Sequence, residues 1–157
     1  MKGKKIWLGM LAMALVIGMT AIGCDDDLKD GGGGTDPALN GTWQSTTNTY
    51  GYEHIGYELR ISNGNWETKY YGQLDEKGTA NDGIATKTHI HGNTWTRYLS
   101  SIPQYSTLNF ESKWYSKNEA QTLFSGVGIN LETYYDQYAY SVDGNTLTWG
   151  QVYYTRK

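Results

Sequence analysis

The stretch that decides the fold is YELRISNGNWETKYY, residues 57–71. In its first half apolar or aromatic residues alternate with polar ones, which is the two-residue period of a β-strand with one buried face. Asn63-Gly64 then supplies the positive φ angles that a tight hairpin turn requires. The second half resumes the alternation and places Trp66, Thr68 and Tyr70 on one face. The stretch therefore predicts an antiparallel hairpin with an aromatic inner face.

The same alternation recurs along most of the chain and predicts about eight strands, with a polar turn at residues 74–77. The expected strands cover residues 41–50, 57–62, 65–71, 78–91 with an interruption at 81–83, 108–115, 137–142, 147–149 and 152–156. In the second part of the fourth strand, one face is expected to point inward and the other outward: Ile84, Thr86, Thr88 and Ile90 against Ala85, Lys87, His89 and His91. A short helical turn is expected near 118–124, begun by Asn118 and ended by Gly126.

Composition favours the same fold class, because the chain has 14 Tyr and 6 Trp but only 2 Phe. Tandem hairpins with one apolar face must cover that face, and a sheet that closes on itself does so and loses its edges. A two-sheet sandwich is the alternative, but it usually needs longer crossovers between strands. We therefore expect an all-β domain over residues 38–157, a single up-and-down antiparallel barrel of about eight strands.

The first residues have the layout of an export signal. Lys2, Lys4 and Lys5 precede an apolar run over 6–22, and Cys24, the only cysteine, follows it. A membrane span is the alternative, since the run is near the lower length limit for one.

The segment AIGC, residues 21–24, resembles the lipobox of bacterial lipoproteins. The resemblance implies a cut before Cys24, a diacylglycerol on its thiol and an acyl chain on the new amino group. Two or more acyl chains hold a protein stably on a membrane. Residues 1–23 are then a signal peptide, and Cys24 is a lipid anchor rather than a nucleophile.

Residues 24–37 contain three consecutive aspartates and four consecutive glycines and have little apolar surface to bury, so they are expected to be a disordered tether. The resemblance places the protein in the bacterial cell envelope, with the outer membrane favoured over the inner one and the leaflet open. Removal of residues 1–23 takes three of the 13 basic residues and leaves 10 against 16 acidic ones, a net charge of −6 that argues against a nucleic-acid partner. We expect a monomer.

Gly41-Thr42-Trp43 resembles the Gly-x-Trp signature that opens the first strand of lipocalins. Together with the Asn-Gly and Asp-Gly turns and a Tyr-Thr-Arg finish, it makes residues 38–157 similar to small bacterial lipocalin-like lipoproteins. In lipocalins this tryptophan packs against an arginine near the end of the last strand. The resemblance implies that Trp43 and Arg156 close one end of the barrel, with cation–π attraction between them.

No motif for nucleophilic, phosphoryl-transfer or zinc-protease chemistry occurs in the chain, so we expect no enzyme activity and no cofactor. His89 and His91 lie two residues apart on one strand face, where both imidazoles can reach one metal ion. The alternative that we favour is a pair of exposed polar residues without a metal.

The aromatic inner face is the main functional feature and supports two hypotheses. In the first, the barrel binds a small apolar or amphipathic ligand through inward rings: Trp66, Tyr70, Phe110, Trp114, Tyr138, Tyr140 and Trp149. In the second, these rings fill the interior. The barrel would then contact a protein or glycan through surface tyrosines: Tyr50, Tyr52, Tyr71, Tyr134 and Tyr135.

Overall fold

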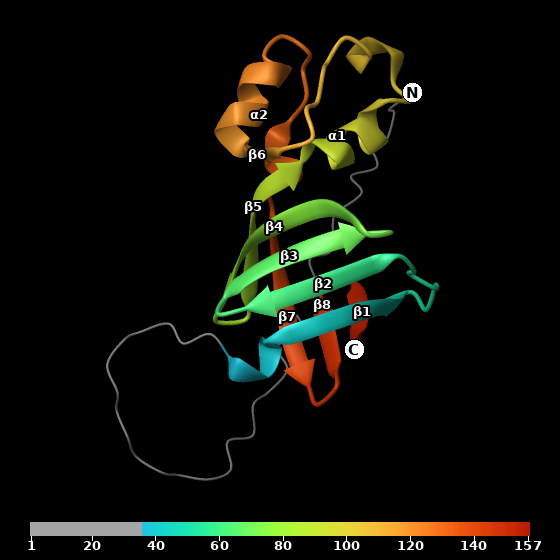
Figure 1. Ribbon diagram of the computed structural model, residues 1–157, viewed down its shortest axis with the longest axis vertical. Coiled ribbons are helices and arrows are strands. Elements are labelled where there is room, and N and C mark those ends of the chain that lie inside the picture. The colour runs from blue at the N-terminus through green and yellow to red at the C-terminus, as the bar shows by residue number, and fades with distance from the viewer. Residues whose placement is uncertain (1–35) are drawn as a thin grey trace, which may run out of the picture. The chain divides into compact units, whose positions relative to one another are not determined.

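The computed structural model describes residues 36–157, which form one antiparallel sheet that closes on itself (Figure 1). Around the barrel the strands follow the order β1-β2-β3-β4-β5-β7-β8-β9, and β9 pairs again with β1. Their bounds are Gly41–Asn48, Tyr57–Ser62, Asn65–Tyr70, Gln73–Asn81, Ile84–His91, Gln137–Asp143, Thr146–Trp149 and Val152–Arg156. The expected closed barrel of eight strands is therefore confirmed.

The signal peptide expected over 1–23, the anchor Cys24 and nearly all of the tether lie outside the described residues. Within the described part, no helix has the length and the apolar character that crossing a bilayer requires.

The hairpin formed by β2 and β3 matches the prediction from its sequence. Tyr57 pairs with Tyr70 and Ser62 pairs with Asn65, so Asn63-Gly64 is a two-residue turn. Both turn residues have positive φ, 47° and 73°. The inner side chains of this hairpin, including Trp66 with 2% of its surface exposed, belong to the barrel core.

The next turn lies earlier than expected. The chain reverses at Tyr71-Gly72, whose φ angles are 46° and 78°, and β4 begins at Gln73. Residues 74–77, expected to be a polar turn, are therefore part of a strand. This shift moves Asp75 and Glu76 into the wall of the barrel.

The expected inner face of β5 is wrong in its first half. Ile84 is exposed, while Ala85 and Lys87 are buried. The two-residue turn Asp82-Gly83 fixes the pairing of Ala80 with Ala85, so these two small residues face inward together. Thr88 is then an extra residue opposite the Lys77-Gly78 junction, and such a bulge reverses the alternation beyond it.

Residues 92–136 form an insertion between β5 and β7 (Figure 1). It contains α1 (Gly92–Leu99), β6 (Trp114–Ser116) and α2 (Lys117–Phe124), with short 3-10 turns at Pro103–Tyr105 and Leu131–Thr133. The predicted strand over 108–115 is thus reduced to β6, which pairs with the end of β5. The insertion has its own hydrophobic cluster, centred on the buried ring of Trp95.

The helical turn expected near 118–124 is confirmed as α2, but Ser116 rather than Asn118 begins it. Ser116 and Glu119 form a capping box, in which the Ser116 backbone N–H donates to the Glu119 carboxylate at 2.8 Å. This arrangement satisfies backbone N–H groups that a helix start otherwise leaves unpaired. Gly126, with φ of 96°, follows the end of the helix.

Replacing Ser116 with alanine should lower the free energy of unfolding by about 1 kcal/mol, because the cap hydroxyl is lost while the helix sequence is unchanged. Ser125→Ala is the matched control, since that hydroxyl lies at the other end of the helix and bonds to the Thr122 carbonyl. Its expected effect is within about 0.5 kcal/mol. Equal losses in urea titrations of the two variants would contradict a capping role for Ser116.

One end of the barrel is covered by the 3-10 turn Pro37–Leu39 and by Trp43 and Arg156, the two residues that the lipocalin resemblance implies there. Trp43 has no exposed surface, and its indole N–H donates to the Leu39 carbonyl at 2.9 Å. The Arg156 guanidinium lies 4.1 Å from the centre of the Trp43 ring. It also donates to the Asn40 carbonyl at 2.7 Å, so the last strand is bound to the segment that precedes the first.

Candidate functional site

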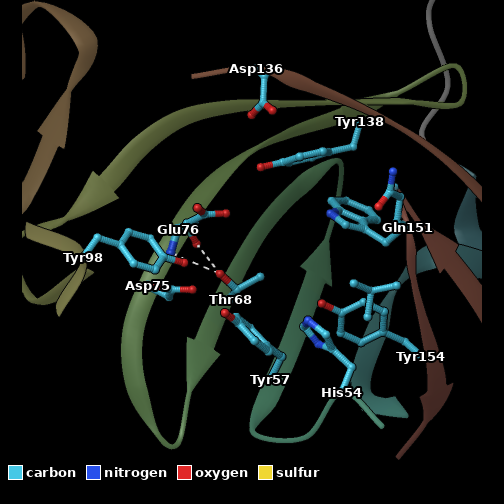
Figure 2. Close-up of a pocket in the computed structure, with 13 residues that line it drawn as sticks. His54, Tyr57, Thr68, Asp75, Glu76, Tyr98, Asp136, Tyr138, Gln151 and Tyr154 are labelled. Carbon is cyan, nitrogen blue, oxygen red and sulfur yellow. Dashed lines mark hydrogen bonds between the residues drawn. The ribbon is translucent and has the colours of Figure 1, made fainter. Parts of the chain in front are cut away.

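The barrel contains a cavity of about 410 Å³ that opens to solvent on one side (Figure 2). Its wall comes from β2, β3, β4, β7, β8 and β9, from α1, and from the loop between β1 and β2. Figure 2 shows Asp75, Glu76 and Tyr98 on one side of the cavity, across from Gln151 and Tyr154. The cavity therefore has an acidic side and a side formed by the last strands.

Asp75 is the most buried of the acidic residues, with 2% of its side chain exposed. Its Oδ1 accepts hydrogen bonds from the Thr94 hydroxyl at 2.5 Å and from Arg97 Nη2 at 2.7 Å. Both donors belong to α1, so Asp75 fastens this helix to β4. The same contact positions Tyr98, the next residue of α1, at the edge of the cavity.

Lys87 joins two further acids. Its ammonium group lies 2.8 Å from Glu76 Oε1 and 3.4 Å from Asp136 Oδ1, and it also lies 5.3 Å from the centre of the Tyr138 ring. Burial raises the pKa of Glu76, and the charge of Lys87 opposes that rise. A buried lysine requires such partners, because an unpaired charge in the interior is strongly disfavoured.

The remaining wall is aromatic and apolar. Tyr57 stacks on His54 with ring centres 4.9 Å apart, and Tyr138, Tyr154 and Trp149 continue the surface. Burial raises the pKa of Tyr57, Tyr138 and Tyr154 above the usual phenol value. These hydroxyls therefore stay protonated at neutral pH and can both donate and accept hydrogen bonds.

The chain matches no protein-family model, no curated protein and no solved structure. What is established is the fold, a closed antiparallel barrel of the lipocalin-like kind.

Five of the seven aromatic residues expected to line the interior are in the barrel. Tyr138 and Trp149 line the cavity directly. Trp66 and Tyr140 pack on Trp149, with ring centres 5.4 and 5.5 Å away. Tyr70 packs against Tyr57, with 4.6 Å between ring centres.

The prediction that Phe110 and Trp114 line the barrel interior is wrong, because the structure places both residues in the insertion. Phe110 stacks on Trp95, with 6.2 Å between ring centres. Trp114 lies edge-on to His91 and beneath the Lys77 ammonium group. The chain leaves the barrel wall after β5, so neither ring can reach its interior.

Four residues of the cavity wall, and the lysine that pairs with two of them, were not expected from the sequence: Asp75, Glu76, Tyr98 and Asp136, with Lys87. Asp75 and Glu76 fall in the expected turn, and Lys87 falls on the expected outer face of its strand. Tyr98 and Asp136 lie in the insertion, whose sequence has no clear hydrophobic period. The usable signal was the Asp82-Gly83 turn, since its register alone places Ala85 and Lys87 on the inner face. The inner position of Tyr57 did follow from alternation.

The two histidines of the metal hypothesis have other contacts. His89 Nδ1 lies 2.9 Å from the Thr88 hydroxyl, and His91 Nδ1 accepts from the Asn93 backbone N–H at the start of α1. Burial lowers the pKa of both imidazoles. In residues 36–157 no group of three or more His, Cys, Asp or Glu side chains is arranged to hold a metal ion.

Proposed function

We propose that the protein is a lipid-anchored, lipocalin-like binding protein that holds a small amphipathic molecule in its barrel without a covalent step. The observation that carries this proposal is the cavity itself. Its volume of about 410 Å³ lies within the usual range for small-molecule sites, roughly 300–1,000 Å³. A barrel of eight strands has room for one such ligand.

The lining supports an amphipathic occupant rather than a purely apolar one. Trp149 and Val152 offer apolar surface, while the hydroxyl groups of Tyr57, Tyr138 and Thr68 border the same space. A ligand with one apolar part and one polar part matches both kinds of surface.

Ligand binding is tested with intrinsic tryptophan fluorescence, because Trp149 lines the cavity. We expect 4-phenylbutan-1-ol, a neutral amphiphile, to change the emission of the full-length protein in a saturable way. Val152→Phe fills the cavity and should weaken binding about ten-fold. Ile84→Phe, on the outside of β5, should leave binding unchanged. Equal affinities of wild type and Val152→Phe would place the ligand elsewhere.

The anchor is proposed on the sequence alone. Mass spectrometry of the protein extracted from membranes should show a chain that begins at Cys24 and carries acyl groups. Cys24→Ala should abolish the acyl modification and leave the signal segment attached to the chain. An unmodified Cys24 in the wild-type protein would exclude the anchor but not the binding cavity.

A surface that contacts a protein or glycan is the second candidate function. Tyr50, Tyr52 and Tyr71 are 71%, 71% and 62% exposed, and Ile55 between them in the loop region is 54% exposed. Exposed aromatic groups of this kind favour contact surfaces. Tyr134 and Tyr135, expected to belong to the same surface, instead pack partly buried against the cluster around Trp95.

A further inference from the structure

The charged residues that line the cavity are all acidic. Asp75, Glu76 and Asp136 are part of its wall, whereas no lysine or arginine of residues 36–157 belongs to it. The basic residues Lys87 and Arg97 contact the same acids from outside the lining. Three carboxylates thus face two cations, and the negative side of each pair faces the cavity.

Each acid keeps hydrogen-bonding capacity after its ion pair is formed. On Asp75 both side-chain hydrogen bonds go to Oδ1, and Oδ2 receives none from the described residues. Lys87 likewise contacts Oε1 of Glu76 and Oδ1 of Asp136 only. The Asp75 side chain is 98% buried and belongs to the cavity wall, so the oxygen without a hydrogen bond has little access to bulk water.

A second polar group borders the cavity without a hydrogen bond to the described residues. Tyr154 is 4% exposed, and its hydroxyl forms no hydrogen bond with any residue that the structure describes. Figure 2 shows this hydroxyl directed into the cavity, on the opposite side from Asp75. The Tyr154 hydroxyl can donate or accept a hydrogen bond, whereas the free oxygen of an ionised Asp75 can only accept, so an occupant that donates hydrogen bonds suits both groups.

The aromatic rings suit a positive charge as well as an apolar body. Tyr57, Tyr98 and Tyr138 surround the acidic side, and Trp149 lies at the apolar side. The faces of such rings attract cations, and cages of aromatic residues are a common way to bind ammonium groups. An anionic amphiphile such as a fatty acid would instead place its carboxylate beside three carboxylates.

We propose that the cavity selects cationic amphiphiles: an ammonium group beside Asp75 and Glu76, and an apolar body against Trp149 and Val152. This inference rests on the proposed function and specifies its class of ligand. The Asp75 and Glu76 oxygens accept hydrogen bonds from the ammonium group, and Asp136 adds negative potential at the edge.

The test compares three probes with the same apolar body: 4-phenylbutylamine, 4-phenylbutan-1-ol and 4-phenylbutyrate. Binding is measured by calorimetry on the full-length protein in phosphatidylcholine nanodiscs, with empty nanodiscs as the blank. We expect the amine to bind about ten-fold more tightly than the alcohol, and the acid most weakly.

Two substitutions that keep side-chain shape test the origin of the preference. Glu76→Gln and Asp136→Asn should each weaken binding of the amine about three-fold or more and change binding of the alcohol less, and the circular dichroism of both variants should match that of the wild type. Glu132→Gln, which removes an acid that is 72% exposed on the insertion, is the matched control and should change neither probe.

The outcomes separate the two proposals. Equal affinities for the amine and the alcohol, or a preference for the acid, would overturn the inference and leave a binding cavity. No binding of any of the three probes would overturn both. A preference for the amine that survives Glu76→Gln and Asp136→Asn together would also overturn the inference, because the charge would then come from elsewhere.

Discussion

Replacing Gly78 with alanine is expected to lower the free energy of unfolding by about 3 kcal/mol or more, or to prevent folding. An added Cβ would lie 1.9 Å from the Thr86 carbonyl oxygen and 2.9 Å from Cε2 of Trp66. The first neighbour is backbone of the adjacent strand, so it cannot rotate away. The strands would have to separate where β4 pairs with β5 and closes the barrel.

The position of Gly78 explains why only a glycine fits. It pairs with Trp66 of β3 on one side and with Lys87 of β5 on the other, next to the bulge of β5. A glycine at such a place allows a strand to bend sharply and neighbouring backbones to approach. Its backbone φ is ordinary, so the expected cost is steric and does not arise from its own dihedral angles.

Gly128→Ala is the control for this experiment. A Cβ at Gly128 would meet nothing within 4 Å, and its φ of 71° should cost roughly 1–2 kcal/mol of backbone strain. Urea titrations should therefore show a clearly larger loss for Gly78→Ala than for Gly128→Ala. If the two variants lost the same free energy of unfolding, β4 and β5 would be able to separate at Gly78 with little loss of stability.

The sequence was sufficient where the signals were local. The Asn63-Gly64 turn and the alternation on both sides of it determine the β2–β3 hairpin, including its register. Successive hairpins of this kind leave one apolar face to be covered, and closure follows from that need. The eight-stranded barrel could therefore be predicted without any knowledge of long-range contacts.

The acidic side of the cavity depends on contacts between distant segments. Asp75 is buried because Thr94 and Arg97 of α1 bond to it, and α1 lies in an insertion whose sequence has no clear period. Hydrophobicity also predicts the wrong inner face for the first half of β5. Ile84 suggested an inner position, but the register of the preceding turn places Ala85 and Lys87 inside. Charge pairing of Lys87 with Glu76 outweighs the usual preference for exposed lysine.

Replacing Trp43 with alanine is the second change expected to have a large effect, a loss of about 3–5 kcal/mol. The ring is completely buried, and its removal leaves a cavity that the surrounding strands can fill only in part. The Leu39 carbonyl would also lose the indole N–H that bonds to it at 2.9 Å. Arg156 would lose the aromatic face below its guanidinium group.

Trp43→Phe separates these contributions. It keeps an aromatic ring for Arg156 and most of the buried volume, and loses the hydrogen bond to Leu39. We expect a loss of about 1–2 kcal/mol, measured by urea denaturation beside Trp43→Ala. A loss below about 1 kcal/mol for Trp43→Ala would contradict a closing role for this end of the barrel. Because the ligand cavity is lined by other residues, Trp43→Phe should bind 4-phenylbutan-1-ol like the wild-type protein, which keeps stability and binding separable.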